Sequence, residues 1–97
     1  MKVYLAGKIA GDPHYKEKFA KWAKKLEVPA GATVVSPAVL PEGMEKADYM
    51  RMCFAMLDSA DMAAFLPDWA ESPGARLEMH WCEYVGKDLI ILDESEN

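Results

Sequence analysis

The fold is decided by the stretch AAFLPDWAESPGARLE, residues 63–78. Its first five residues are apolar and predict a buried strand, whereas the apolar residues of 77–85 recur at helical spacing and predict a helix. Ser72 fits the N-cap of this helix, and Pro73 fits its first position. A strand therefore leads through a polar loop into a helix N-terminus, whose free N–H groups attract anions. Gly74 would let such an anion approach the backbone closely.

The remainder of the chain alternates between short apolar segments and amphipathic segments. Strands are predicted at residues 2–6, 32–35, 61–66 and 88–92, and helices at residues 15–26, 46–57 and 73–85. Residues 29–31 (PAG) are predicted to end the first helix, and Pro37 and Pro41 mark a loop. Because strands and helices alternate, we expect an α/β domain with one parallel four-stranded sheet and right-handed crossovers. The expected strand order is 2-1-3-4.

Composition excludes several classes of protein. The chain has 97 residues, 52% of them hydrophobic, which suits one domain over residues 1–97. The two cysteines, Cys53 and Cys82, lack disulfide or CxxC spacing and indicate a reduced, cytoplasmic protein. No apolar run reaches the roughly 18 residues of a membrane span, and no signal peptide is visible. The net charge of −5 argues against binding of long nucleic acids but is compatible with a single nucleotide.

Two loops are expected at the carboxyl edge of the sheet, where parallel sheets bind ligands. They follow the first and third strands and cover residues 7–12 and 68–74. The candidate ligand-binding residues in these loops are Gly7, Lys8, Ile9, Gly11, Asp68, Trp69, Ser72 and Gly74. The first loop taken alone is equally well explained as a tight turn, because it matches neither a Walker A nor a GxGxxG pattern. Trp69 either stacks on a base or packs within its loop.

Taken together, these residues resemble the nucleoside 2-deoxyribosyltransferase-like superfamily, and most closely the small family called domain of unknown function 4406. The resemblance runs from Met1 to about Leu92. The resemblance rests on residues 3–7 with Ile9 and Gly11, and on residues 36–38, 49–51, 66–69 and 72–78. We therefore expect a flavodoxin-like three-layer sandwich. The resemblance further implies that Glu78 is the nucleophile that attacks the anomeric carbon, and that Tyr4 hydrogen-bonds to it and orients it.

The chemistry implied for Glu78 is reasonable on physical grounds. Breaking an N-glycosidic bond builds positive charge at C1′, and a carboxylate below that carbon can stabilise the charge or form a covalent glycosyl ester. Such a carboxylate has to be ionised at neutral pH, and both a helix N-terminus and a hydroxyl group donated by Tyr4 favour the ionised form. From the residues alone, Glu78 is equally compatible with a solvated helix carboxylate that pairs with a basic side chain.

Ser72 bears on the choice of substrate. The resemblance implies that transferases of the superfamily have an aspartate here, which accepts from the sugar 5′-hydroxyl, whereas the nucleotide hydrolases have a serine that contacts a 5′-phosphate. A hydroxyl group at a helix N-terminus accommodates a phosphate that an aspartate would repel. We therefore expect a 2′-deoxynucleoside 5′-monophosphate as substrate, with water or a second base as acceptor. Lys8 and Arg76 can add positive charge, although Arg76 is equally compatible with solvent exposure.

One position departs from the enzymes of the superfamily. The resemblance implies an aspartate eight residues before Asp61, where this chain has Cys53. A thiol cannot replace a carboxylate as proton donor to the leaving base or as acceptor for the sugar hydroxyl. Another carboxylate can supply the proton, such as Asp68 or one from a neighbouring subunit. Without such a group, the chain is either a slow enzyme or a non-catalytic nucleotide-binding or interaction module.

No cofactor or metal is expected, because the histidines and cysteines lack a recurring zinc-ligand spacing. A homodimer or larger homo-oligomer is expected from the predicted helix at residues 46–57. This helix is apolar nearly all round, at Met50, Met52, Cys53, Phe54, Ala55, Met56 and Leu57. A helix on the face of a sheet should keep one wet side, so the surplus predicts burial against a second subunit. The other expected partner is a small-molecule nucleotide or nucleoside, with no membrane partner.

Overall fold

The computed structural model describes residues 1–94, apart from the side chains of residues 29 and 30. Four parallel strands form one sheet in the order β2-β1-β3-β4. The strands are β1 (Lys2–Ala6), β2 (Thr33–Val35), β3 (Met62–Phe65) and β4 (Leu89–Ile91). In this register Tyr4 of β1 pairs with Val35 on one side and with Ala63 on the other. The strand order expected from the sequence is confirmed, and β1 and β3 lie at the centre of the sheet.

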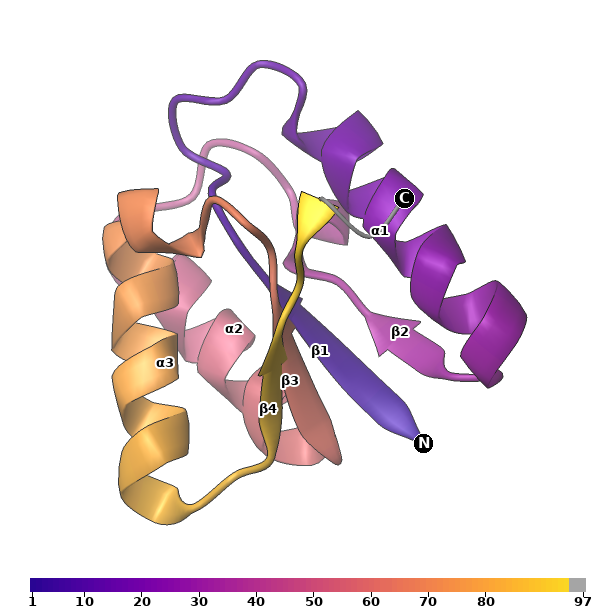
Figure 1. The fold of residues 1–97 in the computed structure, drawn as a ribbon. Helices are drawn as coiled ribbons and strands as arrows, with labels where there is room; N and C mark the ends of the chain where they lie inside the picture. The colour runs from indigo at the N-terminus through magenta and orange to yellow at the C-terminus, as the bar shows by residue number, and fades with distance from the viewer. Residues whose placement is uncertain (95–97) are drawn as a thin grey trace.

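Helices cover both faces of the sheet, which makes the molecule a three-layer sandwich, as expected (Figure 1). α1 (Tyr15–Ala30) lies on one face, and α2 (Lys46–Ser59) and α3 (Pro73–Val85) lie on the other. Right-handed crossovers between parallel strands produce this arrangement.

The side chains of β1 alternate between two apolar clusters, one on each face of the sheet. The cluster under α1 has as its buried residues Val3, Leu5, Phe19, Trp22, Ala64 and Leu66. The cluster under α2 and α3 includes the buried residues Tyr4, Ala6, Cys53, Leu57, Phe65, Ala75, Met79 and Cys82. The period of two along β1 therefore directs Tyr4 towards α2 and α3 and away from α1.

The helix boundaries differ from the sequence predictions at two places. α1 continues through residue 29 to Ala30, whereas residues 29–31 were expected to break it. A proline removes one hydrogen-bond donor, but its fixed φ is close to the helical value, so the helical path can continue. The helix ends at Gly31, which has a left-handed φ of 64° and donates its N–H to the carbonyl of Glu27. α2 extends to Ser59, beyond the predicted end at residue 57.

Two short 3₁₀ turns occupy segments that the sequence predicts as loops. They cover Pro37–Val39 and Trp69–Glu71. The second turn follows β3 and leads directly into α3, so it sets where the helix begins. β2 begins one residue later than predicted, and β3 and β4 are each one residue shorter than predicted at both ends. The residues that flank β3 and β4 still make backbone hydrogen bonds to the neighbouring strands.

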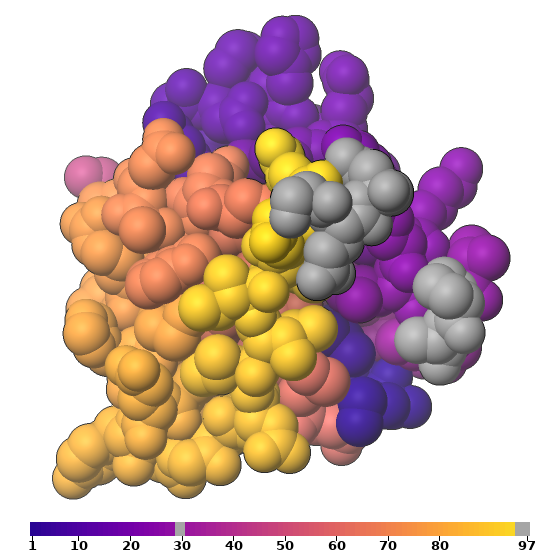
Figure 2. All heavy atoms as spheres, viewed as in Figure 1, coloured from indigo at the N-terminus to yellow at the C-terminus, as the bar shows by residue number. Residues whose placement is uncertain are grey.

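α3 and β4, which lie next to each other in Figure 2, leave apolar side chains exposed. The exposed large apolar residues of these two elements are Leu77, Tyr84, Val85, Ile90 and Ile91. On α2, Cys53 and Leu57 are buried and Met52 is exposed. Some apolar side chains of α2 therefore lie in the core, and others are exposed to solvent. Among residues 1–94, the helices are too short or too polar to cross a membrane.

Candidate active site

Tyr4 and Glu78 form a buried pair between the sheet and α3. Tyr4 lies in the middle of β1, and its hydroxyl donates a hydrogen bond of 2.6 Å to Oε2 of Glu78. Tyr4 has no exposed surface, and Glu78 is 5% exposed. The two residues are 74 positions apart in the chain, so they meet only when α3 packs on the sheet. The structure therefore brings together the pair that the sequence analysis names.

Glu78 is buried because it lies on the apolar face of α3. The buried residues of this helix recur at helical spacing and are Ala75, Glu78, Met79 and Cys82. Within the part of the chain that the structure describes, Glu78 is the only buried charged residue. A carboxylate on the apolar side of a helix is costly to ionise, and functional sites are where such groups gather. Glu78 is therefore not the solvated, ion-paired carboxylate that the residues alone allowed.

Burial changes the ionisation of both members of the pair. Desolvation raises the pKa of Glu78 to about 7, although the hydrogen bond from Tyr4 opposes the shift. We expected the helix N-terminus and Tyr4 to favour the ionised form, but burial has the larger effect on the pKa of this carboxyl group. Burial also raises the pKa of Tyr4 well above its ordinary value, and the charge of Glu78 raises it further. Near neutral pH, Glu78 therefore exchanges its proton and Tyr4 keeps its own.

Two thiols belong to the same cluster as the pair. Cys53 of α2 is 8% exposed, and its thiol lies close enough to the hydroxyl of Tyr4 for each group to influence the pKa of the other. Cys82 lies one turn after Glu78 on α3 and is fully buried. Burial raises the pKa of both thiols, so both are protonated at neutral pH. The residue that stands where the resemblance implies an aspartate is therefore beside the Tyr4–Glu78 pair, as a neutral thiol.

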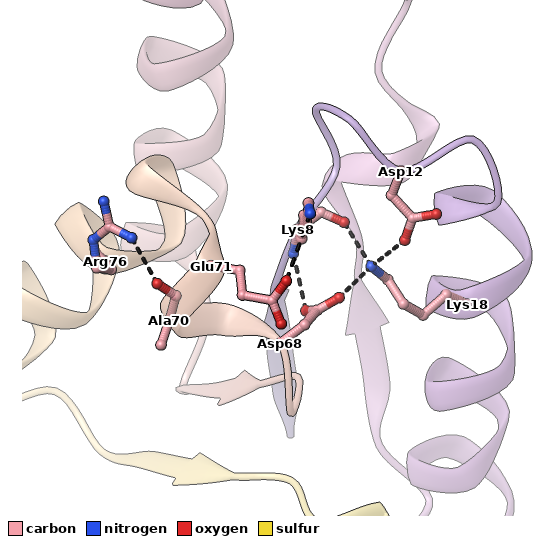
Figure 3. A network of polar contacts seen from close by, with 7 residues as sticks. All are labelled: Lys8, Asp12, Lys18, Asp68, Ala70, Glu71 and Arg76. Atoms are coloured by element: carbon pink, nitrogen blue, oxygen red, sulfur yellow. Dashed lines mark hydrogen bonds and ion pairs between the residues drawn. The ribbon is translucent and has the colours of Figure 1, made fainter.

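Lys18 of α1 joins the two loops at the carboxyl edge of the sheet (Figure 3). Its ammonium group donates to Oδ2 of Asp68 at 2.5 Å, to Oδ2 of Asp12 at 2.6 Å and to the carbonyl of Lys8 at 2.7 Å. The backbone N–H of Lys8 also donates to Oδ1 of Asp68 at 3.1 Å. Sequence reasoning missed Lys18, because it is one of several lysines on α1 and no spacing distinguishes it from the others.

This network engages charges that the sequence analysis assigned to ligand binding. Asp68, which was a candidate proton donor, is instead an ion-paired carboxylate that links the two loops. The ammonium group of Lys8 lies 3.6 Å from a carboxylate oxygen of Glu71. The guanidinium group of Arg76 donates to the carbonyl of Ala70 at 2.6 Å and so holds the 3₁₀ turn against α3. These groups stabilise the loops in the structure described here.

In the first loop, Gly7 allows close packing against its neighbours, and Gly11 allows the chain to turn. A Cβ at Gly7 would lie 2.9 Å from Cβ of Leu66 and 3.1 Å from Oδ1 of Asp68, so only glycine lets the two loops approach. Gly11 has a φ of 83°, a left-handed conformation that glycine adopts without strain. Ile9 packs against the cluster under α1, on the face opposite Glu78. The tight-turn interpretation of this loop accounts for all three residues.

The N-terminus of α3 has the predicted cap. Oγ of Ser72 accepts from the N–H of Ala75 at 3.2 Å. A Cβ at Gly74 would lie 3.4 Å from Sδ of Met50, so the side chain of Met50 occupies space beside this first turn. The position that the sequence analysis assigns to an anion is therefore partly covered by a flexible apolar side chain.

Trp69 packs within its loop, edge-on to Phe65 with ring centroids 5.9 Å apart. It contacts the same cluster that contains Tyr4, so its loop lies on the Glu78 side of the sheet. Two surface hollows lie elsewhere. One, of about 210 Å³, is lined by Lys18, Trp22, Pro67, Asp68, Glu71 and Glu94. The other, of about 410 Å³, lies between α1, β2 and the first 3₁₀ turn. Glu78 lines neither of these two hollows.

The sheet and its helices have the arrangement found in 2-deoxyribosyltransferases of known structure. The 2-desoxiribosyltransferase from Leishmania mexicana matches with a TM-score of 0.72 at 15% identity, over 94% of this chain and 63% of that one. The 2-deoxyribosyltransferase from Bacillus psychrosaccharolyticus matches with a TM-score of 0.68 at 18% identity, over 94% and 71% of the two chains. The chain thus has a nucleoside 2-deoxyribosyltransferase-like fold, and it spans less than two thirds of the Leishmania protein.

Residues 1–91 match the family described as Domain of unknown function (DUF4406), and the chain belongs to this family. The resemblance drawn from the sequence motifs is thereby confirmed. Among curated protein sequences, none matches the chain. Within residues 1–94, no three His, Cys, Asp or Glu side chains are grouped so as to hold a metal ion.

Proposed function

We propose that this protein cleaves the N-glycosidic bond of 2′-deoxynucleoside 5′-monophosphates, with Glu78 as nucleophile and Tyr4 as the residue that orients it. The observation that carries the proposal is the buried hydrogen bond of 2.6 Å between the two side chains. A buried carboxylate whose hydrogen-bond donor is a neutral hydroxyl destabilises the fold when it ionises, which is typical of reactive groups. The fold shared with 2-deoxyribosyltransferases supports the same assignment.

The geometry suits a covalent displacement at C1′. Tyr4 holds Oε2 of Glu78, which leaves Oε1 to attack the anomeric carbon. The C–O bond of a glycosyl ester forms as the bond to the base breaks, and the electron pair of the broken bond stays on the ring nitrogen. Water or a second base then attacks C1′ and releases the Glu78 carboxylate. A 2′-deoxy sugar favours both steps because it lacks an electron-withdrawing hydroxyl group beside the developing charge.

The N-terminus of α3 is the proposed site of the 5′-phosphate. The helix begins one and a half turns before Glu78, and its first-turn N–H groups and partial positive charge favour an anion. Ser72 adds a hydroxyl group without a negative charge. Met50 has to move for the phosphate to reach Gly74, which a flexible thioether side chain can do at low cost.

A non-catalytic nucleotide-binding or interaction module is the second candidate function. The observation that favours it is Cys53, a neutral thiol at the place where an acid would assist the leaving base. The burial of Glu78 also agrees with a pocket that has kept its shape without turnover. The two candidates differ in one measurable property, which is the release of free base.

The test is incubation with each of the four common 2′-deoxynucleoside 5′-monophosphates over a day, with free base measured by chromatography. We expect slow release by the wild type and none by Glu78→Gln, a loss on the order of 10⁴-fold or more. Binding measured by calorimetry should change little, since the amide keeps the shape of the side chain. Tyr4→Phe should reduce release less than Glu78→Gln, because it removes orientation and not the nucleophile.

The matched control is Glu83→Gln, which removes a carboxylate from the exposed side of the same helix. It should release base at the wild-type rate. If the wild type binds nucleotides but releases no base, the enzymatic proposal is wrong and the binding module takes its place. Equal loss in Glu83→Gln would also contradict a specific role for Glu78.

We further propose that a second copy of the chain covers the exposed part of α2. Met52 is 45% exposed on a helix whose other face is in the core. Sedimentation at micromolar concentration should show a dimer or larger species, and Met52→Lys should shift it towards monomer. Lys24→Glu on α1, on the opposite face of the sheet, should leave the assembly intact. A wild-type monomer at high concentration would contradict this proposal.

A further inference from the structure

The site around Glu78 contains one carboxylate. Glu78 is the only buried charged residue among those that the structure describes. Its ionisation is influenced by burial and by Tyr4, and not by a second acid. Enzymes that break glycosidic bonds through a carboxylate nucleophile generally use a second carboxyl group, roughly 5–5.5 Å away, to protonate the leaving group. The described site has no such group.

The carboxylates at the nearby sheet edge are unsuited to that task. Asp12 and Asp68 both accept from the ammonium group of Lys18, and Glu71 lies beside the ammonium group of Lys8. The hydrogen bond from Lys18 holds the pKa of Asp12 below its ordinary value. A carboxylate oxygen that accepts from an ammonium group is occupied as an acceptor, so these side chains are not placed to donate a proton to a leaving base.

The two remaining donors beside Glu78 hold their protons tightly. Burial raises the pKa of Tyr4, and its hydroxyl proton already lies in the hydrogen bond to Glu78. Burial also raises the pKa of the Cys53 thiol. General acid catalysis typically contributes ~10²–10⁴-fold to the rate, so a base that must be protonated in order to leave would leave slowly from this site.

We propose that the preferred substrates of this site are 2′-deoxynucleotides whose base carries a fixed positive charge on its ring, as in an N-alkylated purine. This inference rests on the proposed function and deepens it. When Glu78 attacks C1′ of such a nucleotide, the C1′–N bond breaks and its electron pair neutralises the cationic ring. The base departs as a neutral molecule and needs no proton. Water then cleaves the glycosyl ester, and its proton passes through the released Glu78 carboxyl group to solvent.

The apolar surroundings of Glu78 favour this charge balance. An ionised carboxylate and a cationic base become a neutral ester and a neutral base, so the step removes both charges from a low-dielectric site. With an uncharged base, the same step would transfer the negative charge of Glu78 to the leaving group, which no described cation beside Glu78 would stabilise. The burial that penalises ionised Glu78 therefore selects for a cationic leaving group.

The test compares 2′-deoxyguanosine 5′-monophosphate with its N7-methyl derivative, in which the imidazole part of the ring is cationic. Release of free base is measured by chromatography, and each rate is divided by the rate without protein, because the methylated nucleotide also decays faster by itself. We expect the rate enhancement for the methylated nucleotide to exceed that for the unmethylated one by about 100-fold or more. Glu78→Gln should abolish the enhancement for both.

Cys53→Asp provides a second, independent test of the preference for a cationic base, because it places a carboxyl group beside Tyr4. This variant should raise the rate enhancement for the unmethylated nucleotide and so reduce the difference in rate enhancement between the two nucleotides. Ala20→Asp is the control, since it adds a carboxyl group on the exposed side of α1, on the other face of the sheet, and should leave the difference as large as in the wild type. If Cys53→Asp does not fold, the ratio measured on the wild type still decides the question.

Equal enhancements for the two nucleotides in the wild type would overturn the inference and leave the proposed function intact. A larger enhancement for the unmethylated nucleotide would do the same, and would point to an acid supplied by a neighbouring subunit. Absence of enhancement for both nucleotides would instead refute the proposed function, and the inference with it.

Discussion

Glu78 in the core and Asp12 at the edge of the sheet are both hydrogen-bonded carboxylates, but their ionisation is shifted in opposite directions. Burial raises the pKa of Glu78 to about 7, and a neutral hydroxyl is its hydrogen-bond donor. The hydrogen bond from Lys18 holds the pKa of Asp12 below its ordinary value. One carboxyl group can therefore exchange a proton near neutral pH, whereas the other remains a fixed anion.

The two carboxyl groups differ in whether a cation lies beside them. The Lys18 network joins loops that follow β1 and β3, and the two carboxylates in it share one ammonium group. The Tyr4–Glu78 pair joins the same strand β1 to α3, but its charge has no counter-ion among the described residues. Ionisation of a buried carboxyl group without a counter-ion destabilises the fold, whereas a carboxylate beside an ammonium group is ionised at a smaller cost.

The largest effect is expected for the pH dependence of the free energy of unfolding, because ionisation of the buried Glu78 destabilises the fold. The pKa of Glu78 is raised from 4.5 to about 7, so between these values the folded protein holds a proton that the unfolded chain releases. The free energy of unfolding should therefore fall as the pH rises through this window, by about 3 kcal/mol in all. Glu78→Gln should remove this decrease and be the more stable protein at pH 8.

Urea denaturation at pH 5 and at pH 8 measures this effect. The matched control is again Glu83→Gln, whose pH dependence of stability should follow that of the wild type. If wild type and Glu78→Gln change in parallel between the two pH values, Glu78 does not ionise differently in the folded and unfolded states. The pKa of Glu78 would then not be raised by folding, and its contrast with the lowered pKa of Asp12 would not hold.

An intermediate effect is expected for the edge network. Lys18→Met keeps most of the side-chain volume but leaves Asp12 and Asp68 without their shared cation. We expect a loss of about 1–2 kcal/mol in the free energy of unfolding, since the network is partly exposed but bonded to more than one carboxylate. Hydrogen exchange should become faster in the loop at residues 7–12.

Lys24→Met, on the exposed side of α1, should leave both the stability and the exchange rates nearly unchanged. The Asp12 contribution has the opposite sign from that of Glu78, because a lowered pKa contributes stability that is lost as the pH falls. A Lys18→Met protein that unfolds at wild-type urea concentrations would show that the ion pairs are not what holds the two loops together.

The smallest expected effect concerns the cap of α3. Ser72→Ala removes the hydrogen bond to the N–H of Ala75 and should cost about 1 kcal/mol in stability. In the wild type, 2′-deoxynucleoside 5′-monophosphates should raise the melting temperature more than the matching nucleosides do, because only they bring an anion to the helix end. In Ser72→Ala this difference should shrink.

Thermal unfolding with each nucleoside and its monophosphate measures both quantities. Ser59→Ala, at the C-terminal end of α2, is a control for the loss of a serine hydroxyl group away from the proposed phosphate site. Equal shifts by nucleosides and monophosphates in the wild type would remove the argument for a phosphate at this helix end.

The periodic patterns and local signals were sufficient for much of the fold. The strand order, the start of α3 at Pro73 and the cap by Ser72 are all as predicted. The start and the cap of α3 depend on properties that act within a few residues, namely the fixed φ of proline and the reach of a serine hydroxyl group. The strand order is a pairing between segments far apart in the chain, and no local signal determines it. The end of α1 was wrong because the decisive residue was Gly31 and not the proline before it.

The sequence by itself determined which residues alternate towards α1 or towards α2 and α3, and the family motifs named Tyr4 and Glu78 as a pair. It did not determine what surrounds them. That Lys18 engages Asp68, that Met50 lies beside Gly74, and that Glu78 has a pKa of about 7 were decided by the tertiary structure alone. The reason is physical: desolvation and ion pairing depend on the distance between groups far apart in the chain, and only packing of the helices on the sheet sets those distances.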